Sequence, residues 1–330
     1  MQATDNVQQM ALRALRPVAV LAGLAAGCYL LAIVWAGPEV IWQTAGRLGW
    51  VAVAAAASVV ALGFACRYAR WVLLLHGFGH RLPTSAGLPI YLCGLALTST
   101  PGKAGETLRS VFLLRHGVRL PESLAAFFAD RLSDVIGVAL LGALAAAWIG
   151  DRAPVLEVLA VTVLLLSFGI RALVRRPGLA GAMSRWPIGA QAKRWAGILS
   201  LPVRAWALVW TPGRVPLYVL AALLAYGVQG LVFAYFSAAL ALPLPALRFV
   251  AMFASATLLG AASMVPAGLG VMDAALVLQL TQAGASSDAA LAVAFMTRLV
   301  TLWFGLLVGV LALLHLGWRK GPAQADEAAR

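Results

Sequence analysis

Residues 98–110 have the sequence TSTPGKAGETLRS, and this polar stretch directly follows the apolar run 88–97. It contains one proline, two glycines and three charged side chains, namely Pro101, Gly102, Lys103, Gly105, Glu106 and Arg109. Proline and glycine both interrupt helices, so a helix is expected to break here. The break is either a solvated loop or an unwound turn that lines a cavity.

The composition of the chain indicates a membrane protein. Hydrophobic residues make up 62% of the sequence and charged residues only 11%, which is outside the usual range of soluble domains. A helix needs about 20 apolar residues to cross a bilayer. The sequence therefore predicts an all-α polytopic integral membrane protein with about six full transmembrane helices, in the windows 17–35, 48–66, 123–149, 153–170, 216–241 and 288–316.

The positions of the basic residues predict the orientation. The chain has 22 arginines, 3 lysines and a net charge of +13, and most of these basic residues lie on one side of the predicted spans. The opposite connections contain only Arg47, Arg152 and Arg248. The positive-inside rule then puts both termini in the cytoplasm. We expect segment 171–214, in which tryptophans alternate with basic residues, to form a basic interfacial cytoplasmic helix, and we expect no nucleic-acid partner.

Two segments outside these windows, 83–119 and 243–285, resemble each other. Each begins after a leucine with a proline, continues as an apolar stretch and breaks at Pro-x-x-x-Gly, PGKAG in the first and PAGLG in the second. A carboxylate and a long helix with an arginine follow in both. This similarity predicts an internal repeat of about 82–150 and 242–316 within one transmembrane domain, 1–330. Chance similarity between two Ala/Leu/Gly-rich stretches is the alternative.

The number of spans between the two segments bears on their orientation. Three predicted crossings separate them, so the second segment would enter the membrane from the opposite face. Two re-entrant broken-helix hairpins in an inverted repeat are therefore expected, an arrangement that recurs in transporters. Two short helices that fully span the membrane in each segment, giving ten crossings, fit the charges equally well.

The breaks and two buried arginines point to an anion. The N-terminus of a half-helix after the first break attracts negative charge, and Lys103 and Arg109 add to this attraction. Arg131 and Arg298 lie about 12 and 15 Å along their helices, and an arginine inside a membrane usually pairs or serves function. The candidate substrate-binding residues are Pro101, Gly102, Lys103, Gly105, Glu106, Arg109, Asp130, Arg131, Asp134, Pro266, Gly268, Gly270, Asp273 and Arg298.

Purely structural roles are the alternative for these charges. Glu106 and Arg109 would then form a solvated pair in a cytoplasmic loop. Arg131 would pair with Asp134 or Glu106, and Arg298 with Asp273, only to hold helices together.

Four motifs carry a family resemblance. PGKAGETLRS at 101–110, ADRLSD at 129–134, MVPAGLGVMD at 264–273 and MTRLVT at 296–301 occur in this order. Together they resemble the transmembrane flippase region of the bacterial lysylphosphatidylglycerol synthetase/flippase family, including its stand-alone relatives, over about 48–316. The resemblance implies a flippase-like fold in the bacterial cytoplasmic membrane that acts on aminoacylated phospholipids or other lipid-linked substrates. By motif it assigns function to Glu106, Arg109, Arg131, Asp134 and Arg298.

These observations predict a flippase or transporter for a phosphate-bearing lipid, either a phospholipid or a polyprenyl-phosphate-linked glycolipid. Neither a cofactor nor a metal is expected. Aminoacylation is not expected either, because the sequence contains no aminoacyl-transferase domain. One alternative is a non-transporting membrane partner of a separate glycosyltransferase or lipid-modifying enzyme, and a homo-oligomer is compatible with both. An intramembrane lipid phosphatase is less favoured, because Lys103 and Ala104 follow Pro101-Gly102 where such a turn would carry a hydroxyl.

Overall fold

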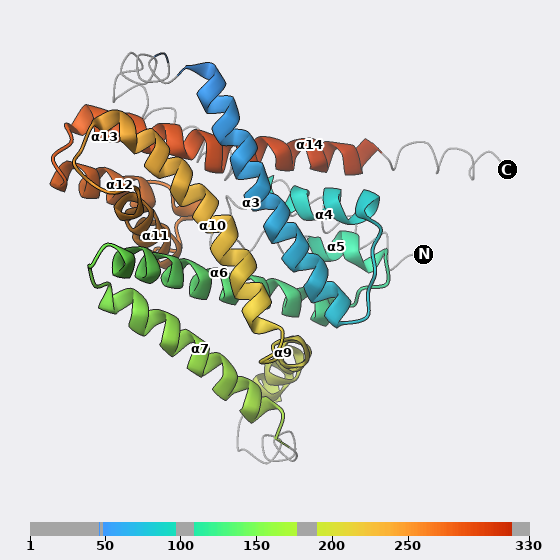
Figure 1. The fold of residues 1–330 in the computed structure, drawn as a ribbon. Helices are drawn as coiled ribbons and strands as arrows, with labels where there is room; N and C mark the ends of the chain where they lie inside the picture. The colour runs from blue at the N-terminus through green and yellow to red at the C-terminus, as the bar shows by residue number, and fades with distance from the viewer. Residues whose placement is uncertain (1–45, 47–48, 97–108, 177–189, 319–330) are drawn as a thin grey trace.

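The computed structural model describes residue 46 and residues 49–96, 109–176 and 190–318, and these residues form helices and no strand. The predicted first span, 17–35, lies outside the described residues. So do five of the candidate site residues, Pro101, Gly102, Lys103, Gly105 and Glu106. The helical architecture confirms the all-α class (Figure 1).

Four helical segments are long and apolar enough to cross a membrane, which agrees with a polytopic protein. A fifth helix, α6, has 29 residues and is also long enough, at about 1.5 Å per residue, although it contains several charged side chains. The four apolar segments are α3 (Trp50–Gly77), α7 (Pro154–Val174), α10 (Val215–Ser237) with the turn after it, and the run from α13 (Ser287–Arg298) into α14 (Phe304–Trp318); α6 covers Leu120–Trp148.

Helix α3 is longer than the window 48–66 that predicted it. The apolar residues 71–75 continue the helix to Gly77, so Arg67 and Arg70 lie inside the helix rather than after it. The predicted window ended at residue 66 and so left both arginines in the loop after the span, and this boundary was wrong. The physical reason is pairing, because Arg70 is fully buried between two carboxylates of α6.

The helix ends collect at two ends of the molecule. At the first end, His80 lies 2.8 Å from a carboxylate oxygen of Glu122, which joins the end of α3 to the start of α6. At the second end, Arg248 forms an ion pair with Asp151, which joins the start of α11 (Ala246–Ala262) to the loop after α6. Arg248, predicted to lie outside, therefore lies at the opposite end from the basic loop after α3.

Several helices are too short to cross a bilayer. Helix α4 (Thr84–Ala96) has 13 residues and α12 (Val271–Gln282) has 12, or roughly 20 and 18 Å at 1.5 Å per residue, against about 30 Å of hydrocarbon. A 3₁₀ turn, Pro266–Gly268, separates α11 from α12 at the predicted second break. The two ends of this hairpin meet, because a Cβ atom at Gly284 would lie 3.8 Å from the side chain of Leu242. Re-entry of the hairpins into a bilayer stays a prediction.

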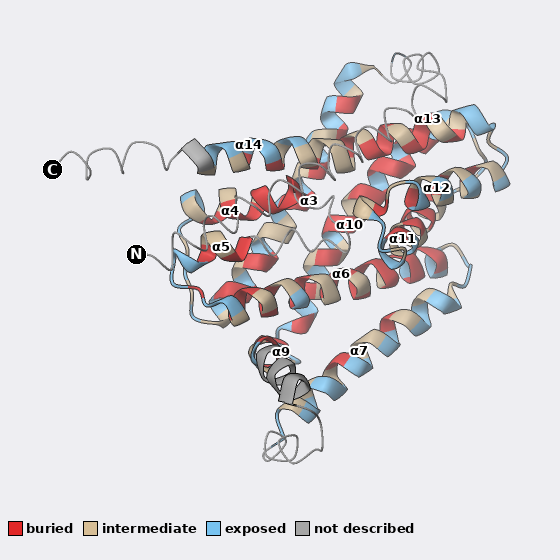
Figure 2. Ribbon diagram, turned by 180° about the vertical axis from the view of Figure 1, so that it is seen from behind, coloured by how far each residue is buried: buried red, intermediate tan, exposed pale blue. Residues whose placement is uncertain are grey.

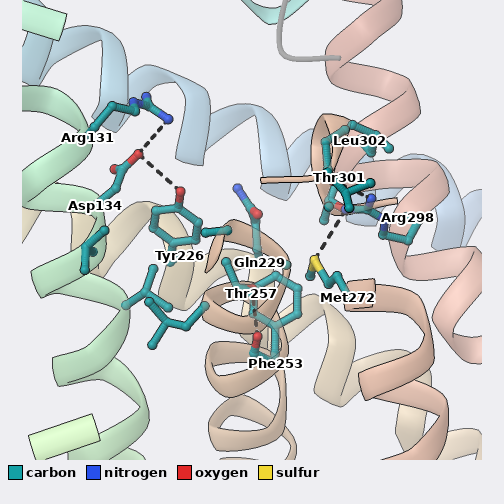
Figure 3. Close-up of a pocket in the computed structure, with 18 of the residues that line it drawn as sticks. Arg131, Asp134, Tyr226, Gln229, Phe253, Thr257, Met272, Arg298, Thr301 and Leu302 are labelled. Atoms are coloured by element: carbon teal, nitrogen blue, oxygen red, sulfur yellow. Dashed lines mark hydrogen bonds and ion pairs between the residues drawn. The ribbon is translucent and has the colours of Figure 1, made fainter. Parts of the chain in front are cut away.

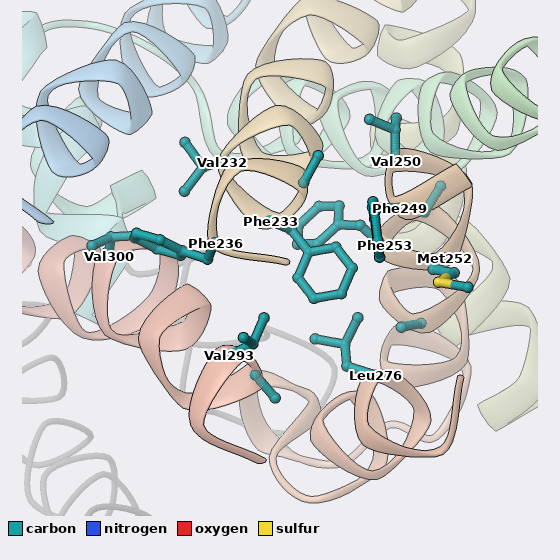
Figure 4. Packing of buried hydrophobic residues seen from close by; sticks show 14 of the residues in the cluster. Val232, Phe233, Phe236, Phe249, Val250, Met252, Phe253, Leu276, Val293 and Val300 are labelled. Carbon is teal, nitrogen blue, oxygen red and sulfur yellow. The ribbon is translucent and has the colours of Figure 1, made fainter. Parts of the chain in front are cut away.

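The two halves of the chain pack across each other. Helix α4 lies along α14, and α11 lies along α6, so each short helix contacts a long helix from the other predicted repeat (Figure 1). Between them α10 contacts α3, α6 and α11. Phe233 of α10 and Phe253 of α11 pack in one apolar core (Figure 4). This reciprocal packing of each short helix on a helix of the other segment is compatible with an internal repeat, which remains a prediction.

A second apolar core surrounds the end of α9 (Ala190–Val209) and the residue after it. Trp206 and Trp210 are both buried there, and the indole of Trp210 donates a hydrogen bond of 2.9 Å to Ser167 of α7. These two tryptophans therefore pack inside the protein, while an interfacial position for the rest of segment 171–214 stays a prediction. By contrast, most of the α7 surface is exposed (Figure 2).

The contact between α4 and α14 depends on a glycine. A Cβ atom at Gly309 would overlap the backbone of Ala96, and this backbone cannot give way as a flexible side chain could. We expect Gly309→Ala to destabilise the protein by about 1–3 kcal/mol, as overpacking does, and to lower the Tm measured in detergent. Gly169→Ala on α7 is the control, because nothing lies within 4 Å of its Cβ position. Equal Tm values for the two variants would contradict the assigned packing.

Cysteine labelling tests the hairpin formed by α11 and α12. In a protein without its native cysteines, Pro243→Cys and Ser287→Cys place thiols before and after the hairpin, at exposed positions. Because the hairpin begins and ends at the same end of the molecule, both thiols should react with an impermeant maleimide from the side that labels Arg152→Cys. The exposed position His116→Cys should react from the other side. Labelling of Pro243→Cys and Ser287→Cys from opposite sides would show that the segment between them crosses the membrane an odd number of times, which contradicts the hairpin.

Candidate functional site

A cavity of about 280 Å³ lies among α3, α6, α10, α11 and α13 (Figure 3). Its wall is mostly apolar and includes Phe253, Leu258 and Met272. The polar and charged side chains of the wall come from helices far apart in sequence. They are Arg67, Arg131, Asp134, Tyr226, Gln229, Thr257, Arg298 and Thr301.

A buried ion-pair network forms one end of the cavity. Asp130 and Asp134 lie one turn apart on α6, and Arg70 of α3 bridges them, with its Nε 2.8 Å from Asp130 and its Nη2 2.7 Å from Asp134. Arg131 contacts the same two acids, at 2.6 Å to Asp130 and 3.1 Å to Asp134. Each buried carboxylate thus has two guanidinium partners. Arg131 forms the expected pair with Asp134, and a second pair with Asp130.

The network explains how charged residues fit into the middle of α6. Burial of a single ion costs several kcal/mol, and only well-placed partners offset this cost. Arg70 is fully buried and supplies such a partner from another helix. Arg131 forms ion pairs with Asp130 and Asp134, yet its side chain is 20% exposed. Part of its guanidinium therefore lies at the cavity surface.

Arg67 adds a second guanidinium to this end of the cavity. It lies one turn before Arg70 on α3, and its guanidinium carbon is 4.2 Å from the ring centre of Tyr226 on α10. The Tyr226 hydroxyl in turn donates a hydrogen bond of 3.2 Å to Asp134. Sequence analysis missed Arg67 and Arg70 because it ended the span at Cys66. The sequence did contain a signal that the helix continues: the two arginines are spaced i,i+3, so they share one helix face, and the apolar run 71–75 follows them.

Arg298 lies at the other end of the cavity, at the C-terminal end of α13. Its Nη2 donates a hydrogen bond of 2.8 Å to the carbonyl of Ala267, and its Nε is 3.1 Å from Asp273. The predicted pairing of Arg298 with Asp273 is therefore present. Asp273 also accepts a hydrogen bond of 3.0 Å from the backbone N–H of Gly270. The carboxylate of Asp273 thus offsets the positive end of the helix dipole at the N-terminus of α12.

The break between α11 and α12 has an unusual backbone. Met264, Ala267, Gly268 and Gly270 all have positive φ, from 54° to 78°. This conformation costs of order 1–3 kcal/mol for a non-glycine residue, and such strain is concentrated at functional sites. At Gly268 a Cβ atom would lie 3.1 Å from the Cα of Gly260. The close approach of the turn to the backbone of α11 therefore also favours glycine at position 268. The hydrogen bond from Arg298 to Ala267 holds this strained turn against the cavity.

The structure brings together most of the described candidate residues. Arg131, Asp134, Gly268 and Arg298 line the cavity. Asp130 and Asp273 lie behind the arginines as their ion-pair partners, while Pro266 and Gly270 shape the break. Arg109 does not line this cavity, because its guanidinium packs on the ring of Tyr91, at 4.4 Å. Gln229 was missed, although it is the only amide in the apolar helix α10.

Two arginine substitutions test whether the buried ion pairs contribute more to the free energy of unfolding than an exposed ion pair does. Arg70→Met leaves Asp130 and Asp134 with one guanidinium fewer in a buried site, and we expect a loss of about 3–5 kcal/mol in the free energy of unfolding. Arg248→Met removes an ion pair whose side chains are 42% and 49% exposed, and the expected loss is below about 1 kcal/mol. Denaturant titration in detergent measures both. Similar losses for the two variants would contradict the structural role of Arg70.

Comparison with known families supports the resemblance inferred from the four motifs. Residues 19–309 match the family model of the lysylphosphatidylglycerol synthase transmembrane region. No curated protein matches the chain. The family and the four apolar helical segments together indicate a membrane location and a membrane domain associated with lipid handling. The match covers well over half of the 330 residues, and the chain therefore belongs to the lysylphosphatidylglycerol synthase transmembrane-region family.

Proposed function

We propose that the protein is a flippase that moves a phosphate-bearing lipid between the leaflets of the bacterial cytoplasmic membrane. In this proposal both termini lie in the cytoplasm and the lipid is not changed chemically. The observation that carries the proposal is the cavity itself. Three arginines from three helices, Arg67, Arg131 and Arg298, line an otherwise largely apolar space between helices long enough to cross a membrane.

The physical requirement for moving such a lipid is to replace the water around its phosphate. Charge-assisted hydrogen bonds from guanidinium groups can do this, and each contributes about 1.5–3 kcal/mol. Arginine also offers two parallel donors, which match the oxygens of a phosphate. The apolar wall, which includes Val135, Phe253 and Leu258, suits the part of the lipid next to the headgroup.

The arginines at the two ends of the cavity support movement rather than static binding. Arg131 of α6 lies at one end of the cavity and Arg298 at the other, beside the strained turn (Figure 3). Arg67 belongs to the first end, because its guanidinium packs on Tyr226, which bonds to Asp134. A phosphate that leaves the first pair can therefore meet a second guanidinium within the same cavity. Contact with Arg298 would compete with its hydrogen bond to Ala267 and would loosen the turn.

Arg67 gives the cleanest test, because its substitution does not break one of the described ion pairs. We expect Arg67→Gln to slow translocation of acyl-labelled phosphatidylglycerol in reconstituted vesicles by about tenfold to a hundredfold, the range that one charge-assisted contact predicts. Arg67→Lys should recover part of the rate, since it keeps the charge but loses the bidentate geometry. Dithionite quenching of the outer-leaflet label measures the rate.

Arg248→Gln serves as the matched control, because it removes a guanidinium from an exposed pair outside the cavity. It should translocate lipid at the rate of the unaltered protein. A folded Arg67→Gln variant with an unchanged rate would contradict a role for Arg67 in lipid contact. If Arg131→Gln with Asp134→Asn translocates normally, then Arg131 holds helices together and does not contact lipid.

A further inference from the structure

We infer that the acyl chains of the transported lipid leave the cavity through an opening at the α11–α12 turn, where Met264 and Val265 contact them. The inference rests on the proposed function and names the part of the site that binds hydrocarbon, which the arginines do not address. It places the headgroup inside the protein and the acyl chains in the surrounding bilayer.

The volume of the cavity requires the two parts of a lipid to be separated. Pockets that enclose most of a drug-sized ligand have volumes of about 300–1,000 Å³. A lipid with two long acyl chains is larger than such a ligand, and the cavity has a volume of about 280 Å³. The cavity can therefore accept a headgroup, whereas the chains need an exit to the surface of the protein.

The exposure of the side chains around the cavity shows where that exit lies. Among the described residues that line the cavity, most are buried or half-buried. The exposed ones lie close together at the end of α11 and in the strained turn, and they are Ala261, Met264 and Val265. Met264 is 62% exposed and Val265 is 37% exposed. All three residues are apolar, so the cavity reaches the surface at an apolar opening.

The opening lies at a depth where hydrocarbon surrounds the proposed transporter. Helix α11 begins at the second end of the molecule and has 17 residues, or roughly 25 Å at 1.5 Å per residue. The hydrocarbon layer is about 30 Å thick, so the turn after α11 lies inside it when the hairpin enters from that end. Leu259 and Val271, before and after the turn, are exposed as well and extend the apolar surface. Acyl chains are the groups that such a surface contacts at this depth.

The backbone of the opening suits contact with hydrocarbon, although it is not a regular helix. The N–H of Met264 donates a hydrogen bond of 3.4 Å to the carbonyl of Ala261, and that of Val265 donates one of 3.3 Å to the hydroxyl of Ser263. The N–H of Gly268 donates one of 2.9 Å to the carbonyl of Val265. Unpaired polar groups of irregular backbone are not tolerated next to lipid, and these internal bonds pair them. Met264 also has a φ of 55°, and backbone strain of this kind is concentrated at functional sites.

Fluorescence quenching tests the inference without requiring translocation. In a protein without its native cysteines, Met264→Cys carries a bimane label, and the vesicles contain phosphatidylglycerol with a nitroxide on one acyl chain. A chain held by its phosphate has a higher local concentration than free lipid, so quenching at Met264→Cys should exceed that at Val161→Cys by about twofold or more. Val161 is a matched control, because it is 55% exposed on α7 and does not line the cavity.

A second substitution connects the opening to the headgroup. Arg67→Gln should remove the excess quenching at Met264→Cys and leave the quenching at Val161→Cys unchanged, because it weakens only the binding of the phosphate. Equal quenching at the two positions, or an excess that Arg67→Gln does not lower, would overturn the inference. So would stronger quenching at Met264→Cys by aqueous iodide than by the nitroxide, or a disulfide-linked dimer of Met264→Cys, since water or a second copy of the chain would then fill the opening.

A translocation assay separates failure of the inference from failure of the proposed function. A bulky apolar maleimide attached to Met264→Cys should stop translocation of acyl-labelled phosphatidylglycerol, whereas the same group on Val161→Cys should leave the rate unchanged. An unchanged rate for the modified Met264→Cys protein would overturn the inference, and the flippase proposal would stand. Excess quenching that depends on Arg67, without translocation by the unaltered protein, would support the acyl-chain site and overturn the proposed function.

Discussion

The structure depends on the buried ion pairs between Arg70 of α3 and the two acids of α6. Two carboxylates one turn apart inside a helix could not be buried without cationic partners, because the desolvation of each ion costs several kcal/mol. Arg70 meets both acids and is itself completely buried. This contact sets the position of α3 against α6, and with it the position of Arg67, which faces the cavity one turn earlier.

The cavity follows from this arrangement and from the break between α11 and α12. Helix α11 is 17 residues long and ends against the cavity, so the strained turn and not a continuous helix forms part of the wall. Arg298 holds that turn through the carbonyl of Ala267. A π-helical segment, Leu299–Trp303, follows Arg298 directly, and segments of this kind often occur at functional sites. Irregular backbone inside a membrane is tolerated where it faces protein or a cavity, and Gly268 of this break lines the cavity.

The two arginine ends are built differently. Arg131 shares two acids with Arg70. Among the residues that the structure describes, Arg298 pairs with one acid, Asp273, which also accepts a hydrogen bond from the backbone N–H of Gly270. The first end is thus fixed between two long helices, while the second is attached to a short, strained segment. We therefore expect the α11–α12 turn, rather than the end fixed by Arg70, to respond first when a ligand displaces Arg298 from Ala267.

The sequence by itself determined the class of protein, the family and two of the cavity arginines. The apolar windows needed only composition and length, and Arg131 and Arg298 stood out because charged residues are costly within long apolar helices. Only the tertiary structure showed that Arg67, Arg70 and Gln229 belong with them and that Arg109 packs on Tyr91 outside the cavity wall. Arg70 and Asp130 are 60 residues apart, so their contact depends on how α3 and α6 pack. Local periodicity describes the faces of one helix, but it does not specify which faces of two distant helices meet.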